Sequence, residues 1–345
     1  MKSKIINQDI KEIINEFKSD LSSLSGKKIL ITGGNGFLGS YLVDVLVEIN
    51  KELKEPCKII VINKNWVNEK SRLFHLVKDD NVSFITFDIG KPFIVPKGID
   101  IIIHTASTAT PTSFLNDPLG TIDSNVNGTR TLLEYAKDNK VKQFIFFSSV
   151  EVYGTPDPKF IPTPETYTGN VNSLNPRACY SESKRFSETL CSVFFRNYEV
   201  PIKILRIGHT YGPGLRDDKA VHEFFTKSIN QKEINLKDSG QAHISFCYIS
   251  DTIKGILKVM FNGNPGEVYN IGNDFYPISI KGLAEMIGEV NKNKTVVNTK
   301  SKMDDSIKYI RHGDVSKLKR LGYEPKVSLE QGLEKFKKHI DEVGL

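Results

Sequence analysis

A series of glycines directly after a short apolar segment is the feature that most constrains how this chain can fold. The segment KILIT predicts a buried strand, and Gly33, Gly36 and Gly39 follow it ahead of a helical pattern. The first glycine permits a tight turn, the second lets the backbone approach a pyrophosphate, and the third lets helix and strand pack closely. The helix N-terminus offers free N–H groups to the phosphates. The pattern therefore predicts a dinucleotide site, in which Phe37 and Leu38 also take part.

Apolar runs and helical patterns alternate along the chain after this loop. Such alternation is typical of a parallel sheet with helices on both faces. The sequence therefore predicts an α/β fold, a Rossmann-type doubly wound parallel sheet. The predicted strands are residues 28–32, 57–63, 82–88, 99–107, 143–149 and 202–208, and the predicted helices are residues 40–49, 124–139 and 178–198.

The regular alternation of predicted strands and helices stops at both ends of this region. An amphipathic helix precedes it, over residues 8–24, and loop-rich segments with short helices follow it after Gly208. The apolar segment FCYISDTIKGILKVMF indicates a return to the first domain. The predicted organisation is an N-terminal helical extension (1–26), a dinucleotide-binding Rossmann domain (27–206, with 247–273 returning to it) and a smaller C-terminal lobe (207–246 and 274–345).

The charge and the cysteine content of the chain limit the kinds of partner that we expect. The net charge is +6, with 47 basic and 41 acidic residues interspersed, and no basic stripe with interleaved aromatics indicates nucleic-acid binding. The four cysteines lack zinc-like spacing, so no metal site is expected, and scattered cysteines suit a reducing compartment. Neither a signal peptide nor a membrane span is predicted. We therefore expect a cytoplasmic protein with no membrane partner.

The end of the second predicted strand bears on which nicotinamide cofactor binds. An acidic residue there would bond the adenine ribose of NAD, but the chain has Asn63 and Lys64. Asparagine can bond a ribose 2′-hydroxyl, and no carboxylate would repel a 2′-phosphate. We predict NAD, with NADP left open. Asp88 is placed to contact adenine or to cap its strand. The predicted cofactor contacts outside the glycine loop are Asn63, Lys64, Asp88, Ile89, Thr105, Ala106, Tyr180 and Lys184.

A tyrosine and a lysine four residues apart form the first candidate catalytic pair. Tyr180 and Lys184 lie one turn apart on a predicted helix, hence on one face. A nearby ammonium lowers the pKa of a phenol, so the tyrosine could act as a base. Ser149, at a predicted strand end, could bond the same substrate hydroxyl, and Glu151 follows it.

With these residues, the chain resembles the extended short-chain dehydrogenase/reductase family that acts on nucleotide sugars. The resemblance covers about residues 27–333 and rests on TGGNGFLG, HTAS, SNVNGT, SSVEVYG, YSESK, RIGHTYGPG and LGYEPKVSLEQGL. It implies that Tyr180 takes the proton from the sugar 4-hydroxyl while hydride passes from C4 to the nicotinamide. It also implies that Lys184 bonds the cofactor ribose, that Ser149 orients the substrate oxygen, and that the C-terminal lobe binds the nucleotide sugar. A homodimer is implied, pairing the helices that contain residues 125–138 and 180–198.

Within the family, the local motifs are most similar to those of UDP-glucuronate decarboxylases. Glu151 matches a glutamate that these enzymes place after the strand, and Arg311 matches an arginine linked to the substrate carboxylate. A guanidinium suits a carboxylate because it offers a planar fork of donors. Arg311 could equally contact a phosphate or pair at the surface. The substrate contacts predicted from the resemblance are Thr108, Arg177, His209 and Arg311.

Three positions depart from the family pattern and keep alternatives open. Val150 stands where decarboxylases have serine and 4,6-dehydratases have aspartate, His209 replaces an asparagine, and Ile244 replaces an arginine that contacts the diphosphate. Lys219 or Arg216 could supply the missing charge. UDP-glucuronate decarboxylation is the first hypothesis. A 4-epimerase, a 4,6-dehydratase, a C4 dehydrogenase and a non-catalytic cofactor-binding regulator remain alternatives.

Overall fold

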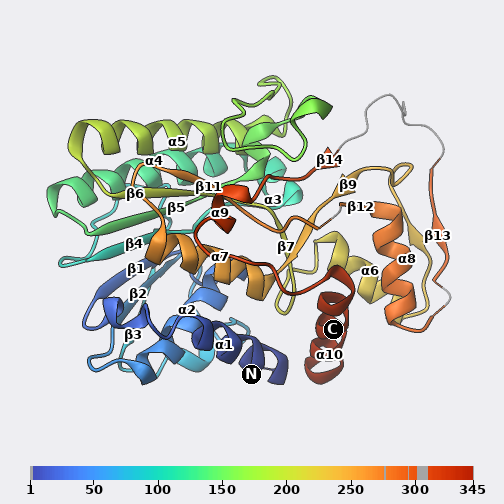
Figure 1. Cartoon of the computed structure of the whole chain (residues 1–345), viewed down its shortest axis with the longest axis horizontal. Helices are drawn as coiled ribbons and strands as arrows, with labels where there is room; N and C mark the ends of the chain where they lie inside the picture. Colours follow the sequence, from blue (N-terminus) through green and yellow to red (C-terminus); the bar gives the residue numbers. More distant parts are fainter. Residues whose placement is uncertain (1–2, 276, 294, 301–309, 345) are drawn as a thin grey trace.

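Seven parallel strands form the main sheet of the computed structural model, which describes residues 3–275, 277–293, 295–300 and 310–344 (Figure 1). The order of the strands is β11-β6-β5-β4-β1-β2-β3. The order reverses between β1 and β4, which is the point where open α/β sheets bind ligands. This arrangement confirms the predicted Rossmann-type sheet. Its strands are β1 (Lys28–Thr32), β2 (Lys58–Asn63), β3 (Val82–Thr86), β4 (Ile101–His104), β5 (Gln143–Ser149), β6 (Ile202–Ile207) and β11 (Val268–Ile271).

Helices cover both faces of this sheet. In Figure 1, α4 and α5 run side by side over one face, and α2 and α7 lie on the other. Apolar strands such as β4, buried at every position, fill the space between these layers. The helices and helical turns of this part are α1 (Lys4–Glu16), η1 (Leu21–Leu24), α2 (Phe37–Ile49), η2 (Asn50–Glu52), η3 (Phe74–Leu76), α3 (Pro111–Asn116), α4 (Pro118–Asp138), η4 (Val150–Tyr153), η5 (Pro158–Phe160), α5 (Ala178–Tyr198), α7 (Ile249–Asn262) and α9 (Ser316–Lys319).

Short strands and helices of the described residues build the lobe to the right of the sheet in Figure 1. Strand β9 lies between β12 and β14, β8 pairs with β13, and β7 pairs with β10. These elements come from segments that are far apart in the chain. They are β7 (His209–Tyr211), α6 (Ala220–Ile229), β8 (Ile234–Asn235), β9 (His243–Ile244), β10 (Phe246–Tyr248), β12 (Ile278–Ser279), α8 (Ile280–Val290), β13 (Val297–Asn298), β14 (Ile310–Arg311) and α10 (Leu329–Val343).

The first helix, α1, is joined to the rest of the molecule through a buried carboxylate. Asp9 accepts hydrogen bonds from Tyr41 of α2 (2.9 Å) and Tyr248 of β10 (2.8 Å), and Lys335 of α10 lies 2.8 Å from its other oxygen. Because Asp9 is fully buried, these partners offset the cost of removing its charge from water. Asp9 therefore ties α1 to both parts of the molecule. Residues 1–2 of the predicted extension lie outside the described residues.

No helix in the described ranges combines the length and apolar character needed to cross a membrane.

Candidate active site

The glycine loop joins β1 to α2 with backbone geometry that side chains would obstruct. Gly33 has φ +70°, and a Cβ there would lie 2.6 Å from the Cα of Ala106. A Cβ on Gly39 would lie 2.5 Å from the Gly33 carbonyl oxygen. Gly36 caps α2, which begins at Phe37 rather than near residue 40 as predicted, so Phe37 and Leu38 lie in its first turn. The open N-terminus of α2 fits a pyrophosphate.

The predicted adenosine contacts lie at the carboxyl ends of β2 and β3. Asn63 ends β2 and accepts the backbone N–H of Asn35 through its side-chain oxygen, at 2.7 Å. The Lys64 ammonium lies 3.0 Å from Asp88, whose other oxygen accepts the N–H of Gly90. Partial burial acts to raise the pKa of Asp88, but the hydrogen bonds from Lys64 and from the Gly90 N–H, together with the charge of Lys64, lower it overall. Ile89 is buried beside Asp88.

Two predicted cofactor residues follow β4 and are fixed against β1. The Thr105 hydroxyl donates to the Thr32 carbonyl oxygen at 2.7 Å, and the Ala106 N–H donates to the Thr32 hydroxyl at 3.3 Å. Ala106 also packs on Gly33. The predicted strand end at residue 107 is therefore wrong by three residues, because the chain turns at Thr105 to make these bonds. The structure brings the glycine loop, the end of β2 and this turn together at one edge of the sheet.

Lys184 of α5 is buried and bound to the neighbouring strand. Its ammonium donates to the Phe147 carbonyl oxygen of β5 at 2.7 Å and lies 4.9 Å from the Phe146 ring centroid. Burial lowers the pKa of Lys184 to about 7. The lysine thus holds α5 against β5, which ends in Ser149.

Tyr180 lies one turn before Lys184 and meets two serines from strand ends. Burial raises the pKa of Tyr180 to about 12, while side-chain hydrogen bonds with Ser149 and Ser107 act in the lowering direction. The pKa of Tyr180 is therefore raised and not lowered as predicted, because desolvation of the phenol is the largest effect and the Lys184 ammonium donates to the Phe147 carbonyl oxygen. The Phe114 ring stacks on Tyr180, with centroids 5.4 Å apart. Ser107 was missed in the sequence, although it follows β4 much as Ser149 ends β5.

Glu151 and Arg311 form an ion pair across the site. Glu151 lies in η4, directly after β5, and Arg311 lies in β14, in register with Ile244 of β9. Burial raises the pKa of Glu151 to about 7, while the charges of Arg177 and Lys219 lower it. Burial also lowers the pKa of Arg311 to about 10.

Of the other predicted substrate contacts, Arg177 is near enough for its charge to act on Glu151. Arg177 is exposed and precedes α5, and Thr108 is half-buried in the loop after β4. Lys219 donates to the Ala109 carbonyl oxygen at 3.1 Å, next to Thr108. Arg216 instead pairs with Asp218 at the surface.

A small cavity of about 20 Å³ is lined by both His209 and Arg311. Its lining includes Val150, His209, Ser245 and Arg311. Burial lowers the pKa of His209 to about 4, so the imidazole is neutral at physiological pH. Val150 lines the same cavity as Arg311, and its side chain carries no hydrogen-bonding group.

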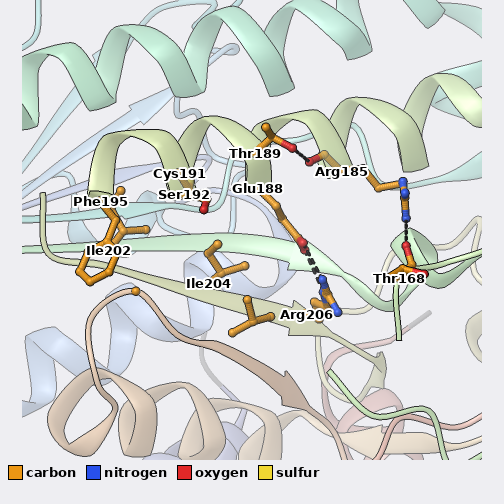
Figure 2. A pocket seen from close by; sticks show the side chains of 12 residues that line it. Thr168, Arg185, Glu188, Thr189, Cys191, Ser192, Phe195, Ile202, Ile204 and Arg206 are labelled. Carbon is orange, nitrogen blue, oxygen red and sulfur yellow. Dashed lines mark hydrogen bonds and ion pairs between the residues drawn. The ribbon is translucent and has the colours of Figure 1, made fainter. Parts of the chain in front are cut away.

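A larger cavity, of about 310 Å³, lies away from these residues, between α5, β6 and β11 (Figure 2). Arg206 of β6 forms a two-pronged pair with Glu188 of α5 there, at 3.0 and 2.7 Å, and Arg185 points toward Thr168. Glu188 also accepts the Ser148 hydroxyl at 2.5 Å. Arg206 and Glu188 are thus paired with each other, and Glu188 also binds β5, the strand that ends in Ser149.

Comparison with known proteins decides the class of this site. Residues 29–272 match the NAD dependent epimerase/dehydratase family. The chain is 36% identical over 310 residues to UDP-glucuronic acid decarboxylase 1 of Arabidopsis thaliana, covering 89% of this chain and 68% of that protein. The chain belongs to the NAD dependent epimerase/dehydratase family.

A second relative and a solved structure are also similar to this chain. UDP-glucuronic acid decarboxylase 5 of Arabidopsis thaliana is 35% identical over 313 residues, covering 90% of this chain and 88% of that protein. The crystal structure of UDP-glucuronic acid 4-epimerase from Bacillus cereus, in complex with UDP-glucuronic acid and NAD, superposes with a TM-score of 0.76. It is 27% identical and covers 92% of this chain and 99% of that chain. The predictions of an NAD-dependent enzyme, and of its relationship to nucleotide-sugar decarboxylases, epimerases and dehydratases, are confirmed.

Proposed function

We propose that this enzyme decarboxylates UDP-glucuronate, oxidising the sugar at C4 and releasing the C6 carboxylate as carbon dioxide. The observation that carries the proposal is the Arg311–Glu151 ion pair beside Ser149 and Tyr180. A guanidinium at this place is suited to a sugar carboxylate. The similarity to UDP-glucuronic acid decarboxylases supports the same substrate.

The first chemical task is proton removal from the C4 hydroxyl. Ser149 and Tyr180 both face this hydroxyl in the proposal, Ser149 orienting the oxygen and Tyr180 taking the proton. When bound, NAD would supply the two-electron acceptor for C4. In the proposal the Lys184 ammonium, one turn along α5, acts on the phenol in the lowering direction, against the burial that raises the pKa of Tyr180.

The second task is loss of the carboxylate once C4 is a ketone. The C5–C6 bond breaks, carbon dioxide leaves, and the bonding electrons pass to C5 and the C4 carbonyl. In the proposal Arg311 exchanges Glu151 for the sugar carboxylate and orients it. Glu151, freed from its partner and raised in pKa by burial, is then protonated and delivers its proton to C5. The C4 ketone is reduced again at the end, so NAD is not consumed.

The test is to incubate the purified enzyme with NAD and UDP-glucuronate and to identify the nucleotide product. We expect a UDP-pentose. Turnover of only a neutral hexose nucleotide would contradict the proposal.

One alternative has a specific observation in its favour, namely 4-epimerisation. One of the solved structures that superpose on this chain is a UDP-glucuronic acid 4-epimerase. An epimerase would return a UDP-hexuronate with C6 retained, so the same incubation separates the two reactions. Dehydration at C6 is disfavoured because Val150 offers no acid.

We also propose a homodimer formed through α4 and α5. These helices expose large apolar side chains, with Leu119 73%, Phe186 52% and Ile122 37% exposed. Exposed apolar groups on one helical layer are typical of a subunit interface. Light scattering of the purified enzyme should give twice the chain mass, and a monomer at all concentrations would contradict this. We keep the cytoplasm as the proposed compartment, since the four cysteines are free thiols.

A further inference from the structure

The end of strand β2 offers a hydrogen-bond donor and a cation where NAD-specific enzymes of this fold place a carboxylate. Asn63 is buried, with 6% of its surface exposed, and it is the last residue of β2. Its side-chain oxygen accepts the Asn35 backbone N–H at 2.7 Å. That bond fixes the orientation of the amide, because a flipped amide would set two donors against each other.

The amide nitrogen of Asn63 is therefore the group left for a ligand. It is buried and has no hydrogen-bond partner in the described structure. Buried polar groups are rarely left without a hydrogen bond, so a ligand that supplies an acceptor here would complete the hydrogen bonding of Asn63. An N–H donor bonds the oxygen of a hydroxyl or of a phosphate equally well, whereas a carboxylate would accept from a hydroxyl and repel a phosphate.

Lys64 adds a positive charge at the same place. Its ammonium lies 3.0 Å from Asp88, and its side chain is 62% exposed. An ammonium has three donors, so Lys64 can keep Asp88 and also bond a phosphate. Asp88 and the more distant Asp117 are the carboxylates that act on Lys64. The pairing with Lys64 offsets the repulsion that Asp88 alone would exert on a phosphate.

We infer that Asn63 and Lys64 form a site for an adenosine ribose 2′-phosphate, so that this enzyme binds NADP as well as NAD. The inference stands apart from the proposed decarboxylation, because cofactor binding is measured without a sugar. It rests on the donor geometry at the end of β2 and on the lysine beside it.

The test is titration of NADH and NADPH, followed by their fluorescence, into full-length protein stripped of bound nucleotide. We expect wild-type dissociation constants for the two cofactors within about tenfold of each other. Lys64→Ala should raise the dissociation constant of NADPH by about fivefold and keep that of NADH within about twofold of the wild-type value. Asn63→Asp keeps an oxygen that can accept from the Asn35 N–H, but its carboxylate repels the phosphate. This variant should therefore bind NADPH about tenfold or more weakly and should still bind NADH.

Lys51→Ala is the matched control. Lys51 is 66% exposed and paired with Glu48, as Lys64 is with Asp88, but it lies in η2, ahead of β2 and thus at the opposite edge of the sheet. This variant should change neither dissociation constant. A wild-type preference for NADH above about a hundredfold would overturn the inference, as would equal weakening of both cofactors by Lys64→Ala.

Discussion

Arg311 and Glu151 form an ion pair although they come from distant parts of the chain, one from a two-residue strand of the C-terminal lobe and one from the turn after β5. The pair lies where Val150 and His209 share a small cavity with Arg311. A guanidinium fixed in this way is prepared to exchange one carboxylate for another.

Replacing the guanidinium tests the exchange. Arg311→Lys keeps the charge but loses the planar fork, so we expect kcat/KM with UDP-glucuronate to fall by about 30-fold or more. Initial rates of product formation give the measurement. Arg216→Lys is the control, because Arg216 pairs with Asp218 at the surface and should retain full activity. Equal rates in wild type and Arg311→Lys would contradict a carboxylate-binding role.

Removing the phenol oxygen tests the proton acceptor. Tyr180→Phe should lower kcat by about 10²–10⁴-fold, because general base catalysis at C4 is lost. The ring remains to stack on Phe114, so NADH binding should persist. Tyr198→Phe, at the exposed end of the same helix, should have wild-type kcat. A Tyr180→Phe enzyme with near-normal turnover would remove Tyr180 from the mechanism.

The pH profile reports on Glu151. Burial raises its pKa to about 7, so the carboxyl is protonated below that pH and ionised above it. A proton donor to C5 is therefore active at low pH, and kcat should fall as pH rises through about 7. Glu151→Gln does not titrate, so its residual activity should lack this descending limb. A limb retained unchanged in Glu151→Gln would assign the titration to another group.

Global stability depends on the buried Asp9. Asp9→Ala leaves the hydroxyls of Tyr41 and Tyr248 and the Lys335 ammonium without their shared acceptor. We expect the free energy of unfolding to drop by about 3 kcal/mol or more, measured by urea denaturation. Asp341→Ala removes an exposed partner of Lys337 on α10 and should change stability by less than about 0.5 kcal/mol. Equal effects of the two variants would show that Asp9 is not the link between α1 and the rest.

The main sheet and helix α5 could be predicted because local pattern determines them. The apolar run of β5 and the long helix α5 have the predicted bounds, 143–149 and 178–198. Helix α2 begins three residues earlier than predicted, because Gly36 already caps it and the loop glycines lie partly within the helix. Strand β4 is shorter than predicted, because Thr105 turns to bond Thr32.

The contacts between distant segments could not be predicted from local pattern. Arg311 meets Glu151 because β14 pairs with β9, and strands of two residues leave almost no periodic signal. Lys219 was one of two candidates for supplying charge, and only the fold places it beside the Ala109 carbonyl oxygen. Ser107 had a usable signal, since it follows β4 and parallel neighbours present their carboxyl ends at one edge.

The most direct test of the central claim follows the C6 carbon itself. UDP-glucuronate isotopically labelled at C6 is incubated with the purified enzyme and NAD, and the gas phase and the nucleotide are both measured. The account predicts labelled carbon dioxide in equal amount to an unlabelled UDP-pentose. Label retained in a UDP-hexuronate, with no labelled gas, would contradict it.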